Sequence, residues 1–208
     1  MKERSVLFWD FDGVIKESVE IKSHAYVALF AQFGEKVVAQ IRSHHEAHGG
    51  MSRFEKIPLY LSWSGQSSDA AEVARYCLRF AHTVRERVID SPWVPGAREY
   101  LEQNHSRQCC VVLTATPQEE IEGILAVLQI ASWFREVHGA PTPKAQAIAA
   151  TLSRWQYPAS KALVIGDSWS DYEAARGARV DFLLRRTPAN TDLQRTYPGP
   201  QCENFIDG

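Results

Sequence analysis

The fold of this chain is decided by SVLFWDFDGV, which is residues 5–14. Residues 6–9 are apolar and predict a short buried strand. Asp10 and Asp12 follow that strand, and because alternate residues of a strand share a face, we expect the two carboxylates to emerge close together where it ends. Two charges so placed repel one another unless a cation or a proton compensates them. The simpler alternative is a solvated turn, since Asp and Gly both favour turns.

The composition is that of a globular protein with one ample core, or with a core domain that carries a smaller insertion. Lys plus Arg number 23 and Asp plus Glu number 25, a net charge of 23 − 25 = −2, and no long basic run occurs. We therefore expect neither nucleic acid nor a membrane as the main partner. The N-terminus predicts no signal peptide, so we expect a cytoplasmic protein. We interpret the four cysteines, which lack CxxC spacing, as reduced thiols: Cys77, Cys109, Cys110 and Cys202.

Residues 18–89 have a purely helical pattern. An apolar stripe ending at Gly34 predicts a helix over residues 18–33. Residues 40–51 are polar and contain three histidines, at 44, 45 and 48, whose spacing fits no strong metal-ligand pattern, so we expect a polar loop. A capping box at Ser52 opens another helix, which Pro58 is expected to kink or shorten. Asp69 is expected to cap a further helix.

Strands and helices alternate from residue 92 onward. We expect strands at 109–113, around 137, at 162–165 and at 182–184, with helices starting near 97, 116, 144 and 168 and a tail of loop from 187. This pattern predicts an α/β fold, a Rossmann-like doubly wound parallel sheet with an inserted α-helical domain. Ligands of such sheets bind beyond the carboxyl ends of the strands. That rule gathers five side chains at one edge: Asp10, Asp12, Thr114, Asp167 and Asp171.

Several carboxylates at one point indicate a hard cation with oxygen ligands, most simply Mg²⁺. A carboxylate is also a known covalent nucleophile toward phosphorus. Thr114, the backbone N–H groups after it, and Lys144 at a helix N-terminus can bind phosphate oxygens, and Asp12 can act as general acid and base. Taken singly, Thr114 and Lys144 are compatible with an ordinary strand-end threonine and a solvated lysine. Together, these residues predict a phosphoryl-transfer site.

The motifs Asp10-Phe11-Asp12-Gly13-Val14, Thr114, Lys144 and Gly166-Asp167-Ser168-x-x-Asp171 resemble the four motifs of the haloacid dehalogenase superfamily. The helical region resembles the cap of its phosphoglycolate-phosphatase-like and β-phosphoglucomutase-like members. The resemblance implies a core of residues 1–17 and 90–208 and a cap of residues 18–89.

The resemblance also implies roles for the site residues. Asp10 would be the nucleophile that becomes an aspartyl phosphate, and Asp12 the acid/base. Thr114, Ala115 and Lys144 would bind the phosphate. Mg²⁺ would be held by the Asp10 side chain, the Asp12 backbone carbonyl, Asp167 and Asp171. Thr114-Ala115 replaces the more frequent Ser/Thr-Asn of the family and removes a side chain that is often close to the substrate.

In the cap, Gly50-Met51-Ser52-Arg53 resembles the motif that faces the active site in these relatives. Arg53 would bind a distal phosphate or carboxylate as a fork, with Lys56 and His45 near it. The alternative is a solvated helix start.

These features predict a Mg²⁺-dependent phosphatase that acts on a small phosphorylated metabolite, such as a sugar phosphate or a phosphoglycolate-like compound, as a monomer or homodimer. A β-phosphoglucomutase-like mutase is the first alternative, but mutases of that kind carry a histidine where this chain has Lys22, and His24 falls two residues beyond. A non-catalytic regulatory or binding protein would be expected to lose Asp10 or Asp12. A protein phosphatase is a weaker variant, because a cap of this size should restrict bulky substrates.

Overall fold

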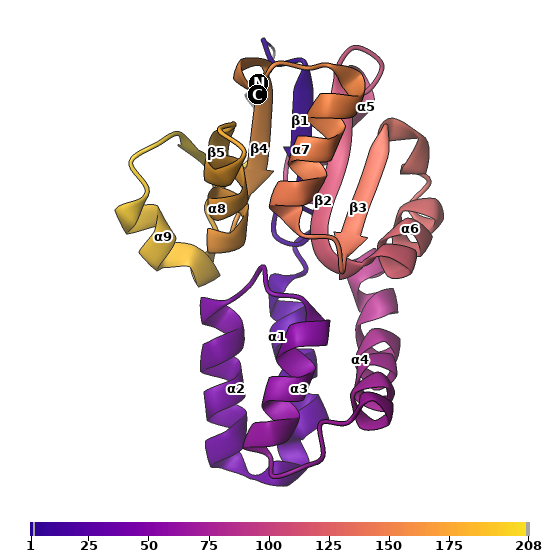
Figure 1. Cartoon of the computed structure of the whole chain (residues 1–208), viewed down its shortest axis with the longest axis vertical. Helices are drawn as coiled ribbons and strands as arrows, with labels where there is room; N and C mark the ends of the chain where they lie inside the picture. The colour runs from indigo at the N-terminus through magenta and orange to yellow at the C-terminus, as the bar shows by residue number, and fades with distance from the viewer. Residues whose placement is uncertain (2, 207–208) are drawn as a thin grey trace.

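A computed structural model describes residue 1 and residues 3–206 of the chain. Its centre is a parallel six-stranded sheet in the order β3-β2-β1-β4-β5-β6, and Figure 1 shows a separate group of helices lying beyond one end of that sheet. The strands are β1 (Val6–Trp9), β2 (Cys109–Pro117), β3 (Glu136–Ala140), β4 (Ala162–Gly166), β5 (Asp181–Arg185) and β6 (Gln201–Cys202). The predicted α/β fold with a parallel sheet is confirmed.

Helices cover both faces of the sheet, which is why the central strands β1 and β4 are apolar throughout. Residues Leu7 and Trp9 of β1 pack with α5 (Ala97–Asn104) and α6 (Gln118–Val127) in one apolar cluster. The alternate residues Val6 and Phe8 pack with α7 (Lys144–Trp155) and α8 (Trp169–Gly177) in the other. The strand β1 is therefore buried on both faces and lies between β2 and β4.

The remaining helices form a bundle that follows β1 in the chain. They are α1 (Val19–Phe30), α2 (Glu35–Ala47), α3 (Arg53–Trp63) and α4 (Ala70–Asp90), with the 3-10 turn η1 (Ala31–Phe33) after α1. Aromatic side chains fill the bundle, and the ring of Tyr26 lies 4.1 Å from that of Phe80 and 5.4 Å from that of Tyr60 between ring centroids. The division of the chain into a core and a cap stays a prediction, with a core of residues 1–17 and 90–208 and a cap of residues 18–89.

Two chain segments connect the bundle to the sheet, one after β1 and one before α5. Lys16 of the first segment contacts the second. Its backbone pairs with Trp93 on the second segment, and its buried side chain donates a hydrogen bond from Nζ to the Ile89 carbonyl oxygen at 2.9 Å. The first segment leaves β1 and the second enters α5, so the bundle lies over the carboxyl end of β1.

Two local predictions in this part of the chain were wrong, because tertiary contacts outweighed the local pattern. The three histidines do not lie in a loop: 44 and 45 are in α2, and 48 ends it, because Ile41 and His45 face the packed bundle. Pro58 lies inside α3 without ending it, and Ile57 and Leu61 are fully buried there; the expected kink or shortening of the helix stays a prediction. The strand β2 runs on through Pro117, which pairs with Ala140 of β3, so the expected N-cap at residue 116 does not form.

The tail, expected to be loop, also contains regular structure. It forms α9 (Thr191–Thr196) and the edge strand β6, which pairs with β5. Short 3-10 turns are η2 (Ala131–Trp133), η3 (Ala159–Lys161) and η4 (Pro188–Asn190). The four cysteines are free thiols. Within the described residues, no helix has both the length and the apolar character needed to cross a bilayer.

Candidate active site

Asp10 is the first residue after β1 and is buried at the carboxyl end of the sheet. The amide N–H of Phe11 donates to its Oδ1 at 2.8 Å, which orients the carboxylate. The chain then turns at Gly13 with a φ of 75°, in the left-handed region. A Cβ at this glycine would lie 2.3 Å from Oδ2 of Asp167, so Gly13 lets the loop after β1 lie against the loop after β4.

Three carboxylates and one ammonium group meet at this point. Oxygen atoms of Asp10, Asp167 and Asp171 all lie within 4.8 Å of one another. Lys144, the first residue of α7, places its Nζ 2.6 Å from Oδ1 of Asp171 and 3.3 Å from Oδ2 of Asp10. Asp171 is also the third residue of the capping box of α8, because the amide of its N-cap residue Ser168 donates to Asp171 Oδ2 at 3.2 Å. The Asp171 carboxylate therefore both caps the N-terminus of α8 and pairs with Lys144.

The carboxylate cluster has more negative charge than Lys144 can compensate. Burial and then the neighbouring carboxylates raise the pKa of Asp10 to about 7, although Lys144 opposes the change. Burial, followed by repulsion from Asp10 and Asp171, also raises the pKa of Asp167 well above its ordinary value. Oxygen donors that are buried and hold excess negative charge suit a hard divalent cation, so Asp10, Asp167 and Asp171 fit Mg²⁺.

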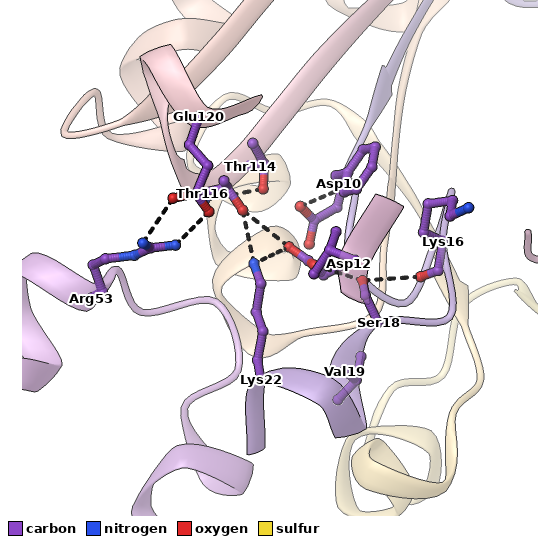
Figure 2. A network of polar contacts seen from close by, with 12 residues as sticks. Asp10, Asp12, Lys16, Ser18, Val19, Lys22, Arg53, Thr114, Thr116 and Glu120 are labelled. Carbon is purple, nitrogen blue, oxygen red and sulfur yellow. Dashed lines mark hydrogen bonds and ion pairs between the residues drawn. The ribbon is translucent and has the colours of Figure 1, made fainter. Parts of the chain in front are cut away.

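Asp12 lies two residues further on and has a different set of partners. Its Oδ1 accepts a hydrogen bond from Ser18 Oγ at 2.6 Å, and its Oδ2 accepts one from Thr116 Oγ1 at 3.2 Å and forms an ion pair with Lys22 Nζ (Figure 2). Burial opposes ionisation, but the charge of Lys22 and these hydrogen bonds together lower the pKa of Asp12. The two aspartates after β1 thus have opposite electrostatic environments.

The end of β2 forms the next wall of the site. Thr114 is buried and its Oγ1 accepts a hydrogen bond from the Thr116 amide at 3.2 Å. Thr114, Ala115 and Thr116 line the same cavity as Asp10 and Asp12. The structure therefore brings together every residue of the core that the sequence predicted for the site.

The helical bundle closes that cavity from the other side. Lys56 and His45 are both buried there, with Lys56 Nζ 2.8 Å from His45 Nδ1. Burial and then repulsion by Lys56 lower the pKa of His45 to about 2, so its ring is neutral and Nδ1 accepts from the ammonium group. Burial also lowers the pKa of Lys56 itself to about 7.

Arg53 also lines the cavity, but its guanidinium group is already paired. Nη1 donates to Oε2 of Glu120 at 2.8 Å and Nη2 donates to Oε1 at 2.6 Å, so the two side chains meet as a fork across the boundary between α3 and α6 (Figure 2). The expected position of Arg53 in the site is therefore observed, whereas its expected availability to a substrate anion is not.

The cavity enclosed by these walls has a volume of about 60 Å³. Gly49 and Gly50 form part of its rim, and a Cβ on Gly50 would lie 1.7 Å from Ser170 Oγ. The bundle is thus seated closely on the carboxyl end of the sheet.

Four residues that contact this site were not among those expected from the sequence. Ser18, Lys22 and Thr116 bind Asp12, and Glu120 binds Arg53. Lys22 was mentioned in the sequence analysis only because the resemblance to the mutases places it where they carry a histidine. Glu120 had none, because its partner lies 67 positions away in the sequence.

The fold and this constellation of side chains define a class of enzyme, and comparison with known proteins identifies it. The family described as haloacid dehalogenase-like hydrolase matches residues 5–179. The chain belongs to this family and is a hydrolase. A phosphoglycolate phosphatase from Pseudomonas fluorescens is 29% identical over 184 residues, which cover 85% of this chain and 67% of that protein.

Solved structures show the same fold at low sequence identity. CbbY from Rhodobacter sphaeroides, crystallised in complex with xylulose-(1,5)bisphosphate, superposes with a TM-score of 0.78 at 15% identity, covering 97% of this chain and 95% of that one. YfnB from Bacillus subtilis, a HAD-hydrolase solved bound to magnesium, superposes with a TM-score of 0.71 at 14% identity, covering 99% and 96%.

Proposed function

We propose that this protein is a Mg²⁺-dependent phosphatase that hydrolyses a small phosphorylated metabolite through an aspartyl-phosphate intermediate. The observation that carries the proposal is the position of the Asp10 carboxylate. It lies within reach of Lys144 and two further carboxylates, and it faces the same cavity as Thr114. Asp10, Asp167 and Asp171, together with the Asp12 backbone carbonyl, would hold Mg²⁺, which when bound would neutralise charge on the phosphate and on these carboxylates.

In the first step, a carboxylate oxygen of Asp10 attacks phosphorus, and the bond from phosphorus to the ester oxygen breaks. Thr114, the amides that follow it, and Lys144 stabilise the charge on the phosphoryl oxygens. Once its ion pair with Lys22 has loosened, Asp12 takes up a proton from the solvent and donates it to the leaving oxygen. In the second step Asp12 takes a proton from a water molecule that attacks the aspartyl phosphate, and inorganic phosphate is released.

The size of the cavity and the relatives support a small substrate. A volume of about 60 Å³ leaves little room beside the phosphate, so residues 18–89 act, in this proposal, as a cap that moves to admit substrate. A relative is named phosphoglycolate phosphatase, and a structural neighbour was solved with a sugar bisphosphate. Phosphoglycolate and small sugar phosphates are therefore the first compounds to test.

We favour hydrolysis over sugar phosphate isomerisation because of Lys22 and His24. Lys22 occupies the position of the mutase histidine and is ion-paired to Asp12, whereas His24 is exposed on α1. We favour catalysis over a purely regulatory role because both Asp10 and Asp12 are present and their carboxylates line the cavity.

The test is a phosphate-release screen with Mg²⁺ over p-nitrophenyl phosphate, phosphoglycolate and small sugar monophosphates. The proposal predicts turnover by the wild type and none by Asp10→Asn. The matched control is Asp181→Asn, which changes an exposed aspartate at the opposite end of the sheet and should retain turnover. Phosphate release that is the same in wild type and Asp10→Asn would refute the proposal.

A further inference from the structure

The ion pair between Arg53 and Glu120 determines what the cap can recognise. Arg53 lines the cavity from α3, and Glu120, in the first turn of α6, pairs with the Arg53 guanidinium group. The exposed fractions of the two side chains are only 4% and 11%. The guanidinium group also lies against the ring of Phe80, with Cζ 4.7 Å from the ring centroid. Its orientation is therefore fixed from two sides before any substrate enters.

A substrate anion that approaches the Nη1–Nη2 end of Arg53 competes with Glu120. Bidentate carboxylate pairing occupies this end of the guanidinium group and cancels its charge. Displacing Glu120 would leave a buried carboxylate unpaired, because Arg53 is the partner that the structure gives it among the described residues. A buried charge that loses its partner is strongly destabilising. Replacing Glu120 by a substrate anion at Arg53 is therefore unfavourable in free energy.

Lys56 has no such internal counter-ion. The structure gives its Nζ a neutral partner, the ring of His45, and no carboxylate within salt-bridge distance in the described part of the chain. Lys56 thus lacks a counter-ion, but its ammonium group is a point charge and cannot bind a distal phosphate as the fork of an unpaired Arg53 would.

We propose that Glu120 is a specificity-determining residue that neutralises Arg53 and so excludes substrates carrying a second phosphate. The inference rests on the proposed phosphatase function and narrows it to phosphate monoesters whose leaving group bears no further phosphate. The sequence predicted that Arg53 would bind a distal phosphate or carboxylate of the substrate. In this proposal Arg53, paired with Glu120, does not bind one. Removing the charge of Glu120 should release the guanidinium fork for a distal phosphate.

The experiment compares two small probes that differ by one phosphate, 3-hydroxypropyl phosphate and propane-1,3-diyl bisphosphate. Each is measured as an inhibitor of p-nitrophenyl phosphate hydrolysis in Mg²⁺, and the readout is the ratio of the two inhibition constants. This ratio can be measured whether or not the probes are themselves hydrolysed. We expect the wild type to bind the monophosphate at least as tightly as the bisphosphate.

In Glu120→Gln, the ratio should shift toward the bisphosphate by about tenfold or more, the effect of one additional charge-assisted hydrogen bond. The control is Glu119→Gln, which removes the same charge from the neighbouring exposed position and should leave the ratio unchanged. The double variant Arg53→Met/Glu120→Gln should lose the shift, because the shift requires the guanidinium group.

An unchanged ratio in folded Glu120→Gln would overturn the proposal. An equal weakening of both probes would also overturn it, because the pair would then only hold the cap closed. Tighter binding of the bisphosphate by the wild type overturns it without any variant. Absence of p-nitrophenyl phosphate hydrolysis by the wild type together with none across the metabolite screen refutes the proposed function instead, so the two failures are distinguishable.

Discussion

Lys56 is a buried cation whose removal should stabilise the protein at neutral pH. We predict that Lys56→Met raises the free energy of unfolding at pH 7 and that the gain shrinks as the pH rises. The physical reason is that Lys56 is 1% exposed, and its ammonium group has only a neutral imidazole as hydrogen-bond partner in the described structure. Taking a charge out of water without an opposite charge costs free energy.

The magnitude follows from the pKa. Burial, and then repulsion by Lys22, lowers the pKa of Lys56 from 10.5 to about 7. Between these values the unfolded chain binds a proton that the native state does not, so stability rises with pH across this window. Below pH 7 the penalty is complete, and about 3.5 pH units correspond to about 5 kcal/mol as an upper limit. A gain of a few kcal/mol for Lys56→Met at pH 7 is therefore expected.

Urea denaturation at pH 7 and pH 9.5 measures this effect. The advantage of Lys56→Met over the wild type should fall by about 3 kcal/mol between the two pH values. Taking the difference between variant and wild type cancels the titration of the buried tyrosines and cysteines. Lys36→Met, which replaces an exposed lysine of α2, should show no such trend. An advantage that is equal at both pH values would refute the reasoning, because the charge of Lys56 would then not be buried.

Three further predictions concern the site. Mg²⁺ at about 100-fold its dissociation constant should raise the melting temperature of the wild type by about 5–10 °C, whereas Asp167→Asn should show little shift in the same thermal melt; no shift in the wild type would count against the cation site. Gly13→Ala, whose Cβ would lie 2.3 Å from Asp167, should lower kcat/KM about hundredfold or more. Its control is Gly177→Ala, where a Cβ meets no atom within 4 Å, and equal activity of the two variants would contradict the argument. Lys22→Met, which removes the cation that lowers the pKa of Asp12, should shift the pH profile of kcat toward higher pH in steady-state assays, and an unchanged profile would exclude a role for that contact.

Several features of the site could be predicted because they depend on short stretches of sequence and on one topological rule. Asp10, Thr114 and Asp167 each follow an apolar run, and the carboxyl ends of parallel strands meet at one edge. Asp171 was predictable because it follows the same strand as Asp167, and Lys144 because it lies at a helix start. The expected roles of these residues remain predictions until turnover is measured.

Other features had only weak local signals, and packing decided them. Residues 40–47 are polar, yet they form α2 because Ile41 and His45 are buried in the bundle. The strand β2 extends through Pro117, past the capping pattern, because β3 supplies a pairing partner. Burial of Ile41 and pairing with a distant strand both depend on segments that local sequence does not place.

The sequence by itself therefore determined the class of fold and which carboxylates meet beyond β1, since alternating strands and helices leave little choice of topology. The tertiary structure alone decided how the helical bundle meets those carboxylates. It paired Arg53 of α3 with Glu120 of α6, left Lys56 beside a neutral histidine, and placed Lys22 on Asp12. The physical reason is that charge pairing depends on which side chains approach within a few ångströms and how deeply they are buried, and both follow from the seating of the helical bundle on the sheet.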